Sequence, residues 1–160
     1  MAAVQLSEVL SVSAALTGAG IRHWAGGGWG VDALVGRQTR LHRDLDLAVD
    51  AAQLSQAVRL LSALGYRPET DWLPVRLELA ADGERWVDLH PVVFGADGDG
   101  RQAGPDGSHF TYPAADLVAG AVAGQPLPCL SARLQRVFHS GCPPRALDEA
   151  DLALLADLPR

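Results

Sequence analysis

The chain has 160 residues, of which 48% are hydrophobic and 20% charged, and this length and composition are typical of one folded domain. Its formal net charge of −6 argues against broad nucleic-acid binding, which requires a basic face to neutralise phosphates. No apolar stretch approaches the roughly 18 residues of a membrane span, and no basic segment followed by an apolar run indicates a secretory signal. We therefore expect a cytoplasmic protein with neither a membrane nor a nucleic acid as its partner.

The N-terminal third predicts two helices and two strands. Apolar side chains within residues 3–19 recur at helical spacing, and residues 21–25 are predicted to form a short buried strand. A glycine run at 26–28 then leads into a helix predicted over residues 29–35. Residues 43–49 alternate apolar and polar side chains and therefore predict a second strand.

The middle of the chain predicts a helix followed by a β-hairpin. Residues 51–64 are amphipathic at helical spacing. The segments 75–79 and 85–93 alternate as strands, and a turn signal at 81–84 joins them. Residues 95–108 are rich in glycine and aspartate and predict a mobile loop.

The C-terminal third predicts mainly short elements. We expect a strand at 110–112, a short helix at 114–121 and an extended segment at 125–130. Two further helices are predicted over residues 131–139 and 145–157.

The order of these elements indicates an α/β (α+β) protein, with a mixed sheet that carries helices on one side. We expect a main domain over residues 1–112. Residues 113–160 are expected to form a small, mostly helical segment that packs on the same domain.

Asp44 and Asp46 stand two apart in the alternating stretch. Strand geometry sends both carboxylates to one face of the sheet and Leu45 and Leu47 to the other. Two carboxylates this close repel each other, which raises the cost of ionising both. Because a divalent cation bound through oxygen ligands offsets that repulsion, the pair suggests a metal site. The alternative is a pair of solvated side chains, since Asp-x-Asp is also common on exposed strands.

The glycine run and a third aspartate strengthen this interpretation. The free N–H groups at the start of the helix after Gly27 and Gly28 suit a phosphate group. The run has a simpler explanation if its turn only needs a positive φ. Asp88 lies in a later alternating strand, where it also has the alternative of an exposed strand residue. Together, a glycine turn and three carboxylates fit nucleotidyl transfer, in which Mg²⁺ bridges the triphosphate.

Two sequence blocks carry a family resemblance. Residues 27–32 (Gly-Gly-Trp-Gly-Val-Asp) and 42–46 (His-Arg-Asp-Leu-Asp) resemble the small antibiotic nucleotidyltransferases of the polymerase-β-like superfamily. The likeness is stronger to the short lincosamide nucleotidyltransferases than to the aminoglycoside 2''-adenylyltransferases. It continues through most of the chain, in residues 72–79, 87–91, 127–131 and 138–141.

The resemblance implies a polymerase-β-like nucleotidyltransferase fold and Mg²⁺-dependent transfer of AMP from ATP to a hydroxyl of a small acceptor, with release of pyrophosphate. By position, Asp44 and Asp46 would bind the metal, and Asp88 would be the general base or share the metal. The residues expected at the nucleotide are Gly27, Gly28, Trp29, Arg40 and His42. For the last two, solvated charge on a loop is the alternative.

The chain departs from the family pattern at two positions. Gly26 stands where relatives often have an acidic residue, which could loosen the turn. Cys142 stands where an aromatic residue is common, which could reshape the acceptor pocket. Neither departure removes a catalytic group. Cys129 and Cys142 have neither the spacing of a zinc site nor that of a disulfide framework, so we expect both to be reduced thiols.

Five residues are candidates for the acceptor site, with a structural role as the alternative for each: Trp72, Arg76, Glu78, His90 and Tyr112. The position of Glu78 depends on the register of the hairpin. A two-residue loop at 82–83 would place Leu77 opposite Asp88. A register shifted by one, with an odd-numbered loop or a bulge, would place Glu78 there.

The acceptor is most simply a lincosamide, which has one amine and an apolar ring. An aminoglycoside would need an acidic cleft, for which the net charge and the acidic 95–108 segment are compatible. A catalytically altered nucleotide-binding relative and a toxin that nucleotidylates tRNA or protein are further alternatives. The retained aspartates argue against the former, and the lack of a basic surface argues against tRNA as a substrate. The sequence leaves open whether the protein is a monomer or a homodimer.

Overall fold

The computed structural model of the protein describes residues 3–139 and 146–158. Cys142, one of the two departures from the family pattern, lies outside the described residues. In the described part of the chain, no helix is both long and apolar enough to cross a membrane.

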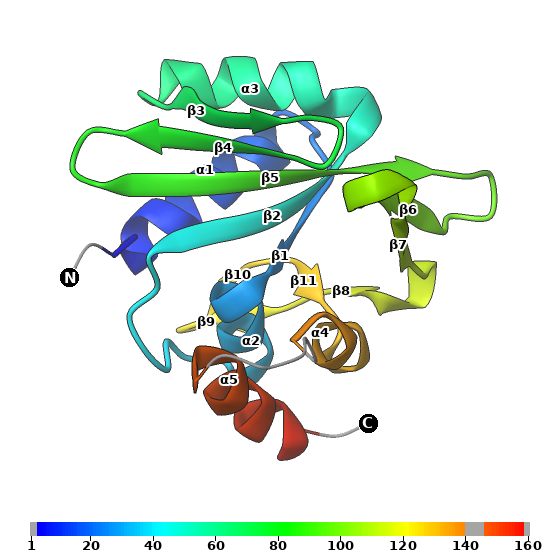
Figure 1. Ribbon diagram of the computed structural model, residues 1–160. Helices are drawn as coiled ribbons and strands as arrows, with labels where there is room; N and C mark the ends of the chain where they lie inside the picture. Colours follow the sequence, from blue (N-terminus) through cyan, green and yellow to red (C-terminus); the bar gives the residue numbers. More distant parts are fainter. Residues whose placement is uncertain (1–2, 140–145, 159–160) are drawn as a thin grey trace.

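A mixed sheet of nine strands forms the centre of the described structure (Figure 1). The order of its main path is β3-β4-β5-β2-β1-β11-β8, and β6 and β7 extend it from β5. The pairs β2–β5 and β1–β11 are parallel, and the remaining pairs are antiparallel. The strands are β1 (His23–Gly26), β2 (Asp44–Asp50), β3 (Arg67–Trp72), β4 (Arg76–Ala81), β5 (Arg85–Phe94), β6 (Gly100–Ala103), β7 (His109–Tyr112), β8 (Leu117–Val118) and β11 (Cys129–Leu130).

Five α-helices accompany this sheet in the described residues: α1 (Leu6–Gly18), α2 (Gly27–Val35), α3 (Leu54–Ala63), α4 (Ala132–His139) and α5 (Ala146–Ala156). Figure 1 shows α1 and α3 along one side of the sheet, whereas α2, α4 and α5 gather near β1 and β11. The predicted α/β class with a mixed sheet is confirmed.

The main core lies on one face of the sheet. Leu45, Leu47 and Val49 of β2 are fully buried there, among side chains from α1, α2 and α3. Each buried side chain of this kind stabilises the fold by about 1.5–3 kcal/mol. Because side chains alternate along a strand, burial of these three sends the carboxylates of Asp44 and Asp46 to the opposite face.

The prediction of a mobile loop at residues 95–108 is wrong. The chain there forms β6, which pairs with both β5 and β7, and a short 3-10 helix, η2 (Pro105–Gly107). Gly98 and Gly107 have φ values of 87° and 77°, so these glycines make tight turns that glycine adopts without strain. The segment is therefore an ordered extension of the sheet.

The prediction of a short helix at residues 114–121 is also wrong. The 3-10 turn η3 (Ala114–Asp116) leads directly into strand β8, and β9 (Ala121–Val122) then pairs with β10 (Gln125–Pro126) in a separate hairpin. Pairing of β8 with β11 outweighs the helical preference of an alanine-rich segment. At Gly120 a Cβ would lie 2.7 Å from Cys129 Sγ, so only glycine allows this close approach.

Strands β8 and β11 join the segment after Tyr112 to the main sheet, and its helical part begins with α4. The division into residues 1–112 and 113–160 stays a prediction.

Candidate active site

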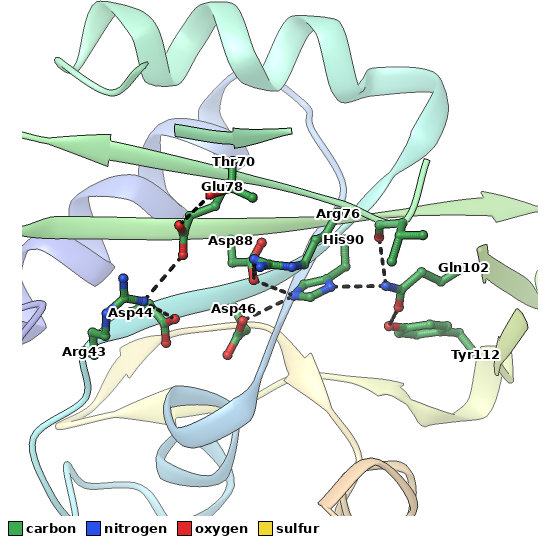
Figure 2. Close-up of polar contacts among 11 residues, drawn as sticks. Arg43, Asp44, Asp46, Thr70, Arg76, Glu78, Asp88, His90, Gln102 and Tyr112 are labelled. Carbon is green, nitrogen blue, oxygen red and sulfur yellow. Dashed lines mark hydrogen bonds and ion pairs between the residues drawn. The ribbon is translucent and has the colours of Figure 1, made fainter. Parts of the chain in front are cut away.

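Three carboxylates lie side by side across three neighbouring strands. Asp46 of β2 is paired with Asp88 of β5, and Asp88 is paired with Glu78 of β4. Residues directly opposite each other in a sheet point to the same face. Asp46, Asp88 and Glu78 therefore form a row on the face away from the main core, and Figure 2 shows them with Asp44 beside the row.

The register of the β4–β5 hairpin follows from its loop. Ala81 pairs with Arg85, so the loop has three residues, 82–84, and not two. Gly83 and Glu84 both have positive φ, at 81° and 58°. The structure thus has the shifted register, in which Glu78 and not Leu77 lies opposite Asp88.

Asp88 is the most enclosed member of the row. Its Oδ2 accepts a hydrogen bond of 2.9 Å from Arg76 Nη1 and lies 3.6 Å from His90 Nε2. His90 Nε2 also lies 3.2 Å from Asp46 Oδ1. The other oxygen, Asp88 Oδ1, is buried and has no hydrogen-bond partner among the described residues. Burial, more than any neighbouring charge, raises the pKa of Asp88.

Asp44 lies at the end of the row that is nearer to Arg43. Arg43 Nη1 is 3.3 Å from Asp44 Oδ2 and 3.4 Å from Glu78 Oε2, and Thr70 Oγ1 donates to Glu78 Oε1. Burial and the charge of Asp46 together raise the pKa of Asp44 to about 6. The site therefore holds more negative charge than its arginines offset.

This arrangement fits a divalent metal ion. Asp46, Asp88 and His90 each offer one ligand atom, and these atoms lie within 4.8 Å of one another. Carboxylate oxygens are the ligands that Mg²⁺ prefers, and the unpartnered Oδ1 of Asp88 is available either to bind such an ion or to accept a proton. A cation here would also relieve the repulsion that raises the pKa of Asp44.

The glycine turn lies directly beside these carboxylates. Helix α2 begins at Gly27, which has a φ of 57°, and a Cβ there would overlap Asp46 Oδ2. A Cβ at Gly28 would overlap His42 Nδ1 and lie 2.9 Å from Arg40 Nη2. Glycine at position 27 therefore lets the start of α2, with its free N–H groups, approach Asp46, and glycine at position 28 leaves room for His42 and Arg40.

We expect Gly27→Ala to lower the nucleotidyl transfer that the family resemblance implies by about 100-fold or more, because the new methyl group must displace the Asp46 carboxylate. Gly20→Ala is the matched control. Gly20 has a φ of 72°, and a Cβ there has nothing within 4 Å. Both variants should lose about 1–2 kcal/mol of unfolding free energy to backbone strain. Equal activity of the two in a steady-state assay would contradict the close fit of Gly27 against Asp46.

The side chains next to the glycine turn inside the protein are those of Trp29, Arg40 and His42. His42 is buried and its Nε2 lies 2.5 Å from Asp32 Oδ2. The ring of Trp29, only 1% exposed, is tilted by 57° against the His42 ring, with 4.7 Å between the ring centres. Arg40 Nη2 pairs with Asp151 Oδ2 of α5 at 3.0 Å. Among the described residues, Trp29 Nε1 and His42 Nδ1 are buried without a hydrogen-bond partner. Contact of these three side chains with a nucleotide stays a prediction.

A cavity of about 310 Å³ opens beside the carboxylate row. Its lining is mainly aromatic and apolar, and Asp46 is the one acidic side chain among the lining residues that the structure describes. The lining residues are Gly26, Gly27, Asp46, Ala48, His90, Gln102, Phe110, Tyr112, Leu130, Phe138 and His139.

The structure brings two of the five acceptor candidates to this cavity, His90 and Tyr112. Arg76 instead pairs with Asp88, and its guanidinium stacks 4.4 Å from the ring centre of Trp72, which is 60% exposed. Glu78 lies in the carboxylate row and is not among the described residues that line the cavity. The role of all five at an acceptor stays a prediction.

Sequence reasoning missed Gln102, Phe110 and Phe138, which line the cavity. Phe110 could have been found from its spacing to Tyr112, since residues two apart on a strand share a face. Gln102 carried no signal, because its segment was interpreted as a loop.

Comparisons with known proteins agree with this geometry. A family model described as aminoglycoside-2''-adenylyltransferase matches residues 8–155. A lincosamide resistance protein of Staphylococcus haemolyticus is 33% identical over 138 residues, which cover 86% of each protein. A 2''-aminoglycoside nucleotidyltransferase of Klebsiella pneumoniae is 29% identical over 131 residues, covering 82% of this chain and 70% of the relative.

Comparison with solved structures also finds similarity to antibiotic nucleotidyltransferases. The lincomycin-bound crystal structure of the lincosamide antibiotic adenylyltransferase LnuA superposes with a TM-score of 0.88 at 30% identity, covering 98% of this chain and 99% of that one. ANT(2'')-Ia in complex with adenylyl-2''-tobramycin gives a TM-score of 0.70 at 21% identity, covering 94% and 88%, and at that identity supports the fold alone.

Proposed function

The chain belongs to the aminoglycoside-2''-adenylyltransferase family and is a lincosamide nucleotidyltransferase-like enzyme, and from this premise we propose that it transfers AMP from ATP to a hydroxyl of a lincosamide, with Mg²⁺ as its metal. The observation that carries the proposal is the row of Asp46, Asp88 and Glu78 beside a glycine turn and an aromatic cavity, which Gly27 and Asp46 both line. The glycine turn suits a triphosphate, and the cavity suits an amphipathic acceptor.

In this proposal Asp44 and Asp46 hold Mg²⁺, and the N–H groups at Gly27 and Gly28 bind triphosphate oxygens. When bound, the ion neutralises charge on the phosphates and orients them for displacement of pyrophosphate. Asp88 accepts the proton of the acceptor hydroxyl. Its raised pKa supports that role, because a base works best when its pKa lies closer to the operating pH.

The cavity favours a lincosamide over an aminoglycoside. A polycation requires several carboxylates, whereas the described lining has one acidic side chain beside the aromatic rings of Phe110, Tyr112 and Phe138. The acidic segment does not supply more to this cavity, because Asp97 and Asp99 line a separate one. An aminoglycoside remains the second candidate, since the family model and several relatives are described by that activity.

A pyrophosphate-release assay tests the proposal. Purified protein with ATP and Mg²⁺ is offered lincosamides and aminoglycosides in parallel, and each product is identified by its mass. We expect release that depends on a lincosamide and a product that carries one added AMP. Release with aminoglycosides alone would favour the second candidate, and release with neither class would refute the acceptor while leaving the fold unaffected.

The binding of Mg²⁺ should depend on pH. The pKa of Asp44 is raised from 3.8 to about 6, so the metal must displace a proton from this carboxyl group below pH 6. We expect the affinity for Mg²⁺ to be about tenfold weaker at pH 5 than at pH 7, as calorimetry can measure. In the absence of metal, the contribution of Asp44 to folding stability changes with pH in the opposite direction. A raised folded-state pKa contributes stability that is present below about pH 4 and is lost as the pH rises through 6. An affinity that is constant across this range would contradict the assignment of Asp44 to the metal.

A further inference from the structure

Gln102 of β6 connects the aromatic cavity to the carboxylate row. Tyr112, in the cavity wall, donates a hydrogen bond of 2.5 Å from its hydroxyl to Gln102 Oε1. Gln102 Nε2 donates to the carbonyl oxygen of Val75 at 3.1 Å and also lies 3.1 Å from His90 Nδ1. Figure 2 shows this chain of contacts running from Tyr112 through Gln102 to His90.

The orientation of the Gln102 amide follows from its partners. A backbone carbonyl only accepts hydrogen bonds, so the side-chain atom that faces Val75 must be the amide nitrogen. The amide oxygen then faces Tyr112, whose hydroxyl can donate. Both Gln102 and Tyr112 are nearly fully buried, which makes an exchange of these bonds with bulk water costly.

The amide nitrogen carries two hydrogens, and its two neighbours use both. One points to Val75 and the other to His90 Nδ1, which must therefore accept with a lone pair. In a neutral imidazole the proton then sits on Nε2, the atom that lies 3.2 Å from Asp46 Oδ1 and 3.6 Å from Asp88 Oδ2.

We propose that Gln102 is a positioning residue that fixes the tautomer of His90, so that the ring presents an N–H group and not a lone pair to Asp46 and Asp88. The tautomer rests on the hydrogen-bond network alone, and its importance for catalysis rests on the proposed function. His90 thereby holds the carboxylates of Asp46 and Asp88 through its N–H group. In this tautomer neither ring nitrogen has a free lone pair, so within the candidate metal group only the two carboxylates could bind the ion. A lone pair on Nε2 would require a proton on Nδ1, where it would face the N–H of Gln102.

The arrangement also links acceptor and metal. Tyr112 lines the cavity and holds the oxygen of Gln102, whose nitrogen sets the ring that contacts the carboxylates. A merely structural Gln102 would hold β6 to the backbone at Val75 without determining which nitrogen of His90 is protonated. The protonation pattern of the ring therefore separates the two roles.

Nitrogen-15 NMR of the 160-residue protein at pH 9 measures this pattern directly; the alkaline pH keeps the ring neutral, since Asp46 raises the pKa of His90 despite the burial of the ring. His90 signals are identified by their loss in His90→Asn. We expect a pyridine-type Nδ1 and a pyrrole-type Nε2 in the wild type. Gln102→Met keeps the length of the side chain but has no donor, and it should lose this pattern. Tyr112→Phe, the matched control, leaves both donations of the amide intact and should retain it. A pyrrole-type Nδ1 in the wild type, or an unchanged pattern in Gln102→Met, would overturn the proposal.

Activity supplies the second readout. We expect Gln102→Met to lower kcat about tenfold with little change in the KM for ATP, since a hydrogen bond to a charged group is being misdirected. His90→Asn, which retains an N–H donor, should keep about ten times more activity than His90→Ala. An unchanged kcat in Gln102→Met would refute the positioning role. Absence of any transfer by the wild type, together with the expected tautomer, would refute the proposed function and leave the tautomer standing.

Discussion

Asp88→Asn should lower kcat for nucleotidyl transfer by about 10²–10⁴-fold while the affinity for Mg²⁺·ATP changes little. Asparagine fills the same space and can still accept a hydrogen bond from Arg76, which now lies 2.9 Å from Asp88 Oδ2. It cannot take a proton from an acceptor hydroxyl. Single-turnover rates and calorimetric ATP binding separate the chemical step from binding.

Glu78→Gln distinguishes Asp88 from its neighbour in the row. Glu78 faces the same side but is bound to Arg43 and Thr70. We expect a much smaller loss of kcat than in Asp88→Asn. A larger loss would transfer the role of base to Glu78. If Asp88→Asn also abolishes metal-dependent ATP binding, Asp88 belongs among the metal ligands.

The central strands and the carboxylate face follow directly from the sequence. Alternation in residues 43–49 leaves one choice once Leu45 and Leu47 are buried, because a shift by one residue would place both leucines in solvent. The glycine turn is equally local, since a helix start and a positive φ are properties of a few neighbouring residues.

The remaining parts of the site depend on contacts that no local pattern encodes. The hairpin register depends on whether one non-glycine residue, Glu84, adopts a positive φ. The contact between Gln102 and His90 requires that the 95–108 segment be a strand, and the pairing of that segment depends on β7. The Arg40–Asp151 pair joins residues separated by most of the chain.

Asp46 contacts both parts of the proposed site, the candidate metal group and the glycine turn, so both depend on it. Its carboxylate belongs to the candidate metal group with that of Asp88, and its Oδ1 lies 3.2 Å from His90 Nε2. Its Oδ2 lies against the glycine turn at Gly27. A metal ion bound there would therefore be adjacent to the triphosphate site, which is the geometry that phosphoryl chemistry requires.

We expect Asp46→Asn to abolish Mg²⁺ binding and to lower transfer by about 10³-fold or more. The variant should not be less stable without metal, because removing the Asp46 charge relieves a repulsion that raises the pKa of Asp44. We expect Mg²⁺ to raise the Tm of the wild type and to leave the Tm of Asp46→Asn unchanged. Thermal unfolding with and without Mg²⁺, beside the steady-state assay, measures all three effects.

Asp50→Asn is the matched control, with the same substitution on the same strand and the same face. Asp50 pairs with Arg22 at 3.2 Å and accepts a hydrogen bond from the amide of Ala52, away from the metal group. This variant should keep the response of Tm to Mg²⁺ and nearly all activity. Loss of both in Asp50→Asn would mean that any charge change on β2 disturbs the site. Magnesium-dependent transfer by Asp46→Asn within tenfold of the wild type would exclude Asp46 from the metal, and the catalytic centre would then have to lie elsewhere along the row.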